Sequence, residues 1–170
     1  MTDVVVRQAS PADAEALHLL ISSHLDEGHL LPRALDELRL HASRFLVCEL
    51  RGQVAACGEL APLSPTVAEI RSLVVARDAR LCGLARRLVG ELRHRARTAG
   101  FRTLCAFTHD ARFFVRQNFS IVPHVWVPEK ILTDCQGCPL FRQCRQYAMV
   151  LPLDELPRYG SVGRSVAAVA

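Results

Sequence analysis

The amino-acid sequence predicts an α/β fold, more closely an α+β arrangement in which helices flank a central mixed sheet. Two observations lead to this prediction. The 170 residues, 50% of them hydrophobic, can bury one sizeable core but not two large ones. Segments with the period of a strand also alternate with segments of helical period, and three strands follow one another in mid-chain. We therefore expect one domain over residues 1–153 and a loosely ordered tail over residues 154–170.

The first part of the chain predicts a strand and two helices. "DVVVRQA" alternates between apolar and polar positions as a half-buried strand does. Ser10 can cap the helix that follows, because Pro11 stands at its first position and Asp13 in its first turn. Apolar residues at helical spacing then predict a second helix over residues 32–42.

The middle of the chain predicts a three-stranded meander followed by a long helix. "RFLVCEL" and "QVAACGELAPL" flank the turn sequence "RG", and "VAEIRSLVVA" is the third strand. The long helix is expected over residues 83–99. Its apolar stripe consists of Ala85, Leu88, Val89, Leu92 and Ala96.

The last part of the chain predicts a strand, a short helix and two further strands. "RTLCAFT" has the composition of a strand. Asp110 can cap the short helix, and Asn118 suits the left-handed turn that ends it. "FSIVPH" and "YAMVLPL" are expected to complete the sheet.

The charge pattern and the cysteine content narrow the class of protein. The net charge is +4, and Lys130 stands alone among 21 basic residues that are otherwise arginine. Only 6% of the residues are aromatic, whereas nucleic-acid binders interleave aromatics with clustered charge, so no nucleic-acid partner is expected. The chain shows neither an export signal nor a run of membrane-spanning length, which predicts a cytoplasmic protein without a membrane partner. In the reducing cytoplasm, the seven cysteines would be thiols or metal ligands.

A glycine-containing turn before the long helix predicts an anion site. In "VVARDARLCGLARRLVGEL" the turn joins the third strand of the meander to the helix. A helix N-terminus offers unpaired N–H groups and a partial positive charge, and Arg80 and Arg86 add charge. The sequence has neither the three glycines of a dinucleotide fingerprint nor the Gly-Lys-Ser/Thr ending of a P-loop.

The turn also carries a resemblance to a known family. "RLCGLA", residues 80–85, fits the Arg/Gln-x-x-Gly-x-Gly/Ala motif of the GNAT superfamily of acyl-CoA-dependent N-acyltransferases. Further stretches resemble the short, stand-alone N-acetylglutamate synthases of bacterial arginine biosynthesis. They are "DEGHLLPRALDEL", "AEIRSLVVARDAR", "FFVRQNF" and "VPEKILTDCQGCPLFRQCRQYAMVL". The resemblance covers roughly residues 3–153.

The resemblance implies an enzyme, a fold and a cosubstrate site. The enzyme would move the acetyl group of acetyl-CoA to the α-amine of L-glutamate by direct attack in a ternary complex. The pyrophosphate of acetyl-CoA would lie on Arg80, Leu81, Cys82, Gly83, Leu84, Ala85 and Arg86. The pantetheine arm would pair with the backbone of Leu73, Val74 and Val75, where one amide could also stabilise the oxyanion of the intermediate. Phe114 is expected to complete this site.

The acceptor site is expected to hold two carboxylates. Arginine forms bidentate pairs with carboxylates, and the resemblance makes Arg33 and Arg71 the two clamps, with Lys130 as a third cation and Thr108 beside them. Glu69 has two alternative roles. It could take the proton of the amine through a water, or it could be an ion-pair partner that orients Arg71.

The group that reprotonates the CoA thiolate stays unassigned. Many members of the superfamily use a tyrosine on the short helix where this chain has "ARFFVRQNF". His109 and Tyr147 are weak substitutes, and a thiol with a pKa near ~8.5 can leave without much help.

Three cysteines near the C-terminus raise the alternative of a metal site. Cys135, Cys138 and Cys144 include C-x-x-C spacing, but a closed zinc site needs a fourth ligand, from His124 or Cys105. Reduced structural thiols or a labile disulfide are favoured over zinc, because only three ligands are local. The other cysteines, Cys48, Cys57, Cys82 and Cys105, are expected to be small fillers of the core or of the phosphate turn.

Two other functions stay open. One is a GNAT acetyltransferase that acts on another amino acid, a small amine or a protein N-terminus. The other is a non-catalytic metal- or redox-sensing module. A homodimer is compatible with the resemblance.

Overall fold

The computed structural model describes residues 4–154 of the chain. Within them seven strands form one sheet in the order β1-β2-β3-β4-β5-β7-β6, in which only β4 and β5 run parallel. The strands are β1 (Val4–Gln8), β2 (Phe45–Leu50), β3 (Gln53–Pro62), β4 (Val67–Val75), β5 (Thr103–Thr108), β6 (Ser120–Val122) and β7 (Tyr147–Pro152). The helices are α1 (Ala14–Ser22), α2 (Leu35–Leu40), α3 (Leu84–Thr98), α4 (Ala111–Val115) and α5 (Pro128–Lys130). The predicted mixed sheet flanked by helices is confirmed.

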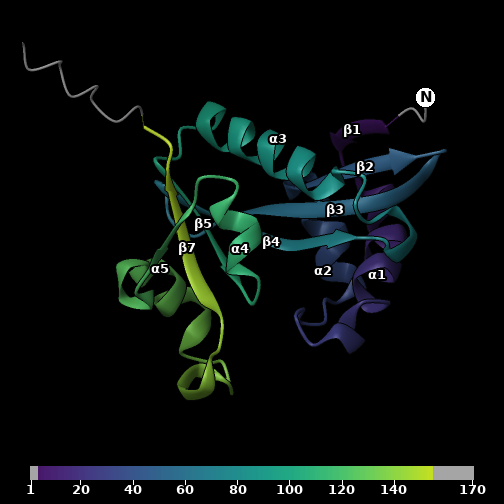
Figure 1. Ribbon diagram of the computed structural model, residues 1–170. Helices are drawn as coiled ribbons and strands as arrows, with labels where there is room; N and C mark the ends of the chain where they lie inside the picture. Colours follow the sequence, from purple (N-terminus) through teal and green to yellow (C-terminus); the bar gives the residue numbers. More distant parts are fainter. Residues whose placement is uncertain (1–3, 155–170) are drawn as a thin grey trace, which may run out of the picture.

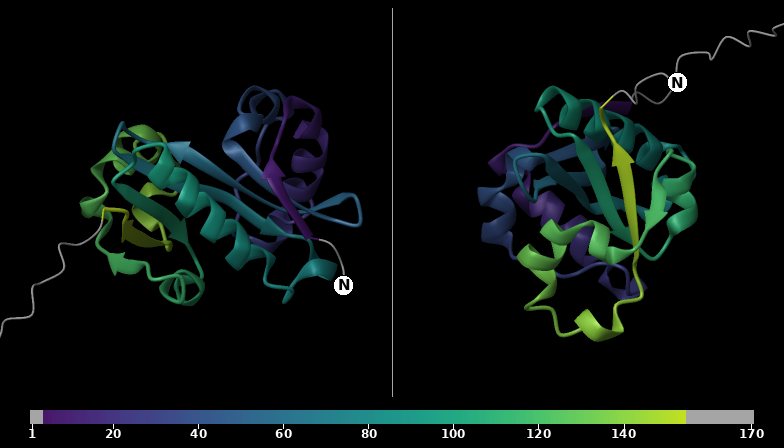
Figure 2. Two further views of the ribbon diagram at one scale, coloured as in Figure 1. Left: turned by 90° about the horizontal axis from the view of Figure 1, so that it is seen from above. Right: turned by 90° about the vertical axis from the view of Figure 1, so that its left-hand side faces the viewer.

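Helices cover both faces of the sheet (Figure 1). α3 lies on one face, where Leu88 and Leu92 are fully buried. α1 and α2 lie on the other face, where Leu17 and Leu38 pack in one cluster with Phe45 of β2. β7 and α5 lie at the end of the molecule opposite β1 and α1 (Figure 2). The sheet therefore separates two apolar layers.

Several short-range predictions match the structure. Ser10 caps only the 3-10 turn Pro11–Asp13, where its backbone N–H donates to the Asp13 carboxylate at 2.7 Å, and Asp13 is the N-cap of α1 itself. The Asp110 carboxylate accepts the N–H of Phe113 at 3.3 Å and so caps α4. Asn118 has a φ of 68°, as a left-handed turn requires.

Three local predictions were wrong. The second helix is only α2, and a separate 3-10 turn follows it at Ala42–Arg44. "FSIVPH" gives only the three residues of β6, because Pro123 has no N–H for the ladder and a 3-10 turn follows it. In α3 the predicted stripe is right except at its first residue, because Leu84 is buried while Ala85 is only half-buried.

Strands β4 and β5 separate halfway along their length, and this positions the site. Their parallel pairing covers only four positions, from the Val67–Thr103 pair to the Ile70–Ala106 pair. Beyond it, β4 continues along β3 as far as Val75, and β5 continues along β7. Within residues 4–154, the last part of β4 therefore has a sheet neighbour on one side only.

Two further expectations concerned the C-terminal tail and membrane-spanning segments. Apart from Asp154, the predicted tail lies outside the described residues. Among residues 4–154, no helix has the length and apolar character needed to cross a bilayer.

Candidate active site

A cleft of about 1120 Å³ lies where β4 and β5 separate. One wall comes from the segment between α1 and α2, and the other from α5 and the segment up to residue 146. These two parts lie on the same side of the sheet, with β4 between them (Figure 1). The free edge of β4 lines the cleft.

The edge of β4 offers backbone groups to an extended ligand. Leu73, Val74 and Val75 line the cleft. The register between β3 and β4 shifts between Arg71 and Val74, where Ser72 takes the left-handed φ of 47°. The bulge turns β4 at this point, which is a common way to re-aim strand groups at a site. The geometry fits amides of a ligand that lies alongside β4 as an additional strand would.

The glycine turn lies next to this edge. Leu81 and Gly83 both have positive φ, of 67° and 76°, and Gly83 is the N-cap of α3. Of the predicted turn residues, Arg80 and Ala85 line the cleft, as does Phe114 from α4. Leu81, Cys82, Gly83 and Arg86 are exposed beside it, and Leu84 is buried in the core. The fold thus brings the unpaired N–H groups of α3 next to the free edge of β4.

An acidic segment in the wall between α1 and α2 reaches the turn. Glu27 accepts hydrogen bonds from Arg80 at 2.7 and 2.8 Å, and Asp26 accepts from Arg77 at 2.7 Å. Arg80 Nε also donates to the carbonyl of Val75 at 3.4 Å. Arg80 is therefore held between the end of β4 and Glu27.

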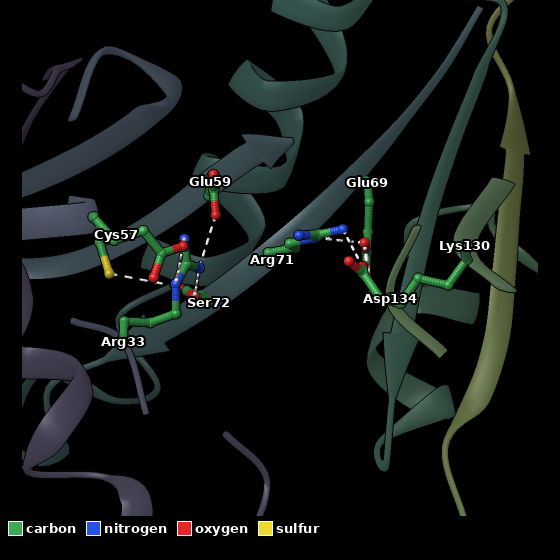
Figure 3. A network of polar contacts seen from close by, with 9 residues as sticks. Arg33, Cys57, Glu59, Glu69, Arg71, Ser72, Lys130 and Asp134 are labelled. Carbon is green, nitrogen blue, oxygen red and sulfur yellow. Dashed lines mark hydrogen bonds and ion pairs between the residues drawn. The ribbon is translucent and has the colours of Figure 1, made fainter. Parts of the chain in front are cut away.

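Four charged side chains form a network at the opposite end of the cleft (Figure 3). Arg71 Nε donates to Glu69 at 2.6 Å, and its Nη2 donates to Asp134. Lys130 Nζ donates to Glu69 at 2.8 and 2.9 Å and to Asp134 at 2.8 Å. Glu69 is 3% exposed, whereas the Asp134 side chain is 35% exposed. Glu69 is thus the fixed partner and Asp134 the accessible one.

The cations in this network stay charged despite their burial. Burial opposes the charge on Lys130, but the charge of Glu69 and hydrogen bonds to Asp134 and Glu69 outweigh it, so the pKa of Lys130 is raised. The pKa of Arg71 is raised likewise, because Glu69 and Asp134 outweigh the effect of burial. Both side chains can therefore bind an anion at neutral pH.

Arg33 belongs to a separate group beside this network, toward Glu59 of β3 (Figure 3). Its guanidinium donates to Glu59 at 2.8 Å, to Ser72 Oγ at 2.9 Å and to Glu37 at 2.8 Å. Burial opposes its charge, and the bonds to Glu37 and Glu59 outweigh it, so its pKa is raised. Arg33 and Arg71 both line the cleft, but each is held by carboxylates of the chain itself.

The residues considered for proton transfer lie in different places. The Glu69 carboxylate is occupied by Arg71 and Lys130, as the ion-pair alternative requires. His109 lines the cleft and packs against His29 with ring centroids 5.0 Å apart. Burial and the neighbouring His29 lower its pKa. Thr108 also lines the cleft, and its hydroxyl accepts the N–H of Asp110 at 3.0 Å.

The three C-terminal cysteines also line the cleft, beside the charged network. The N–H of Cys138 donates to the carbonyl of Cys135 at 3.0 Å, and Cys144 Sγ lies 4.0 Å from His124 Nε2. In the part of the chain that the structure describes, no three His, Cys, Asp or Glu side chains are grouped to hold a metal ion. Burial raises the pKa of Cys135, which favours the thiol.

Sequence reasoning did not single out the partners of the predicted cations, among them Glu59, Ser72 and Asp134. Glu59 and Ser72 contact Arg33 from strands distant in sequence, and no local pattern reveals such contacts. A signal for Asp134 was available, because it stands four residues after Lys130, the spacing of a helical ion pair.

Comparison with known proteins identifies the class to which this fold and cleft belong. The model of the acetyltransferase (GNAT) family matches residues 14–119. The chain belongs to this family, as the sequence predicted, and is an acetyl-CoA-dependent N-acetyltransferase.

Individual relatives give a finer comparison. An uncharacterized N-acetyltransferase of Chlorobaculum tepidum is 32% identical over 151 residues, which cover 89% of this chain and 97% of the relative. An amino-acid acetyltransferase of Pseudomonas putida is 33% identical over 118 residues, which cover 68% of this chain but only 27% of that protein. This chain thus spans about a quarter of the Pseudomonas enzyme.

Solved structures share the fold. N-acetylglutamate synthase from Neisseria gonorrhoeae, in complex with coenzyme A and N-acetyl-glutamate, superposes with a TM-score of 0.80 at 25% identity and covers 91% of this chain and 36% of its own. A Mycobacterium tuberculosis protein in complex with CoA and NLQ has a TM-score of 0.76 at 24% identity, and covers 87% of this chain and 98% of its own.

Proposed function

We propose that this enzyme transfers the acetyl group of acetyl-CoA to the α-amine of L-glutamate, giving N-acetylglutamate for arginine biosynthesis. One observation carries the proposal. Arg33, Arg71 and Lys130 line the same cleft as the free edge of β4, so cations for two carboxylates lie beside the place where a thioester would be held. The relatives named amino-acid acetyltransferase and the gonococcal synthase support this acceptor class.

In this proposal the chain binds and orients both substrates. The N–H groups at the start of α3, together with Arg80, bind the pyrophosphate of acetyl-CoA, and the edge of β4 pairs with its pantetheine arm. Bound acetyl-CoA supplies an acetyl group activated as a thioester. Arg33 and Arg71 hold the carboxylates of glutamate and so aim its α-amine at the thioester carbonyl.

The transfer replaces a C–S bond by a C–N bond. The attacking amine gives up a proton, and the CoA sulfur leaves as a thiolate. A backbone N–H of β4 stabilises the charge that develops on the thioester oxygen. Glu69 pairs with Arg71 and Lys130 and so orients them, and the proton that the amine loses passes to solvent.

Kinetics of two arginine variants test the acceptor assignment. Loss of a charge-assisted hydrogen bond to a ligand costs about 1.5–3 kcal/mol, so Arg71→Ala should raise the KM for glutamate by about tenfold to a hundredfold. The Kd for CoA should stay unchanged. Arg87→Ala, on the exposed face of α3, is the control. An unchanged KM for glutamate in both Arg33→Ala and Arg71→Ala would rule out the clamp.

The Glu69→Gln variant distinguishes between the two alternative roles of Glu69. If Glu69 orients the cations, the variant mainly raises the KM for glutamate. If it is the general base, the variant lowers kcat, and the acidic limb of the pH–kcat profile disappears.

A further inference from the structure

Glu27 occupies the arginine that the proposed function assigns to the pyrophosphate of acetyl-CoA. Arg80 Nη2 donates to both carboxylate oxygens of Glu27, at 2.7 and 2.8 Å, and Arg80 Nε donates to the carbonyl of Val75 at 3.4 Å. Both side chains line the cleft, and neither is buried, because Arg80 is 43% exposed and Glu27 is 30% exposed. A ligand that enters the cleft can therefore reach this contact.

The pair joins two segments that are far apart in the chain. Glu27 ends the 3-10 turn that follows α1, while Arg80 stands in the glycine turn before α3. A neighbouring pair joins the same two segments, because Asp26 accepts a hydrogen bond from Arg77 at 2.7 Å. Asp26 and Arg77 are not part of the lining of the cleft, whereas Glu27 and Arg80 are. Only one of the two pairs therefore lies at the cosubstrate site.

The charge of Glu27 sets it against a phosphate ligand. Hydrogen bonds from Arg80 and Arg77 lower the pKa of its carboxyl group, so the carboxylate is negative at neutral pH. An N–H group of a guanidinium that donates to a carboxylate oxygen is not free for a phosphate oxygen. The two anions also repel each other. A pyrophosphate can therefore take Arg80 only by displacing Glu27 or by lying beside its charge, and both cost affinity.

We propose that Glu27 is an internal competitor of the cosubstrate: its carboxylate holds Arg80 in the free enzyme, and the pyrophosphate of acetyl-CoA or CoA replaces it there. Glu27 thereby lowers the affinity for acetyl-CoA and for the product CoA alike. The opposite role, in which Glu27 aims Arg80 at the pyrophosphate, predicts a change of opposite sign. The inference rests on the cosubstrate half of the proposed function and is independent of the acceptor.

The Glu27→Gln variant tests the competition, because it removes the charge and keeps the shape of the side chain. Isothermal titration at low ionic strength would measure the Kd of CoA and of 3′-phospho-ADP, which has the nucleotide and the pyrophosphate but no pantetheine arm. Asp26→Asn is the matched control, because it removes the same charge from the same segment but outside the lining of the cleft. Arg80→Gln and the double variant with Glu27→Gln complete a double-mutant cycle.

We expect Glu27→Gln to bind both ligands about twofold to fivefold more tightly, which is the range for one exposed ion pair. Salt screens such a contact, so the gain should disappear at about 1 M salt. Asp26→Asn should leave both Kd values unchanged. Arg80→Gln should weaken the binding of both ligands, and Glu27→Gln should give no gain in that background, because the arginine for which the anions compete is missing.

Other outcomes overturn the inference. Weaker binding of both ligands in Glu27→Gln would mean that Glu27 aims Arg80 at the pyrophosphate, and unchanged binding would mean that the two anions do not compete. An equal gain in Asp26→Asn, or in the Arg80→Gln background, would mean that only the overall charge matters. Failure of the unaltered enzyme to bind CoA would refute the cosubstrate half of the proposed function and the inference with it. CoA binding without acetylation of glutamate would refute only the acceptor.

Discussion

Asp134→Asn should make the enzyme more selective for acidic acceptors. Asp134 is the accessible member of the network and accepts hydrogen bonds from both Arg71 and Lys130. With Glu69, the four side chains have two positive and two negative charges, so the substitution changes their sum from 0 to +1. A carboxylate of glutamate competes with Asp134 for the same donors, whereas the amide of glutamine can donate to Asp134 itself.

The structure gives a rough magnitude for the change in the KM for glutamate. Two unit charges 4 Å apart interact by about 4 kcal/mol at an effective dielectric constant of 20. The Asp134 side chain is 35% exposed, so solvent screening reduces the effect to about 1 kcal/mol, or about fivefold in KM. The KM for glutamate should fall by about this factor, and that for glutamine should rise or stay constant.

The assay is product formation by mass spectrometry with glutamate and glutamine as separate acceptors. Asp36→Asn is the control, because the Asp36 side chain is 95% exposed and pairs with Arg39 on α2. If Asp134 merely orients the cations, its loss would raise the KM for both acceptors. A ratio of kcat/KM for glutamate over glutamine that stays constant or falls would refute the reasoning.

Three further predictions concern the turn, the N-terminal ion pair and the thiols. Gly83→Ala should lower the free energy of unfolding by about 1 kcal/mol in a denaturant titration, because Gly83 has a φ of 76° and a Cβ there meets no atom within 4 Å. Arg7 lowers the pKa of Asp13, so this pair stabilises the fold fully above the ordinary pKa of an aspartate and loses its effect as the pH falls below it. Asp13→Asn should therefore flatten the acid side of the stability profile measured by thermal unfolding. Alkylation followed by peptide mass spectrometry should modify exposed Cys82 long before buried Cys57, whose pKa burial raises to about 12, and CoA should protect Cys82.

The sequence was informative wherever local chemistry decides structure. The caps at Ser10 and Asp110, the left-handed Asn118 and the stripe of α3 are each set by residues within a few positions of one another. The same is true of Gly83 at the start of α3. These features, with the family motif, were sufficient for the fold class and the enzyme class.

The sequence was uninformative where partners are far apart in the chain. Arg71 and Asp134 are 63 residues apart, and Arg80 and Glu27 are 53 apart. Whether an arginine is free for a ligand or already held by a carboxylate depends on such tertiary contacts, which the pattern around the arginine does not contain. Arg33 therefore gave no sign of being held by Glu59.

A competition among acceptors tests the central claim most directly. The enzyme would receive acetyl-CoA and an equimolar mixture of glutamate, glutamine, aspartate, ornithine and a short peptide with a free N-terminus, and mass spectrometry would quantify each acetylated product. Because the acceptors compete at one concentration, the initial product ratios equal the ratios of kcat/KM. The proposed function predicts that N-acetylglutamate is the largest product. A larger yield of any other acetylated acceptor, or no acetylated product at all, would contradict it.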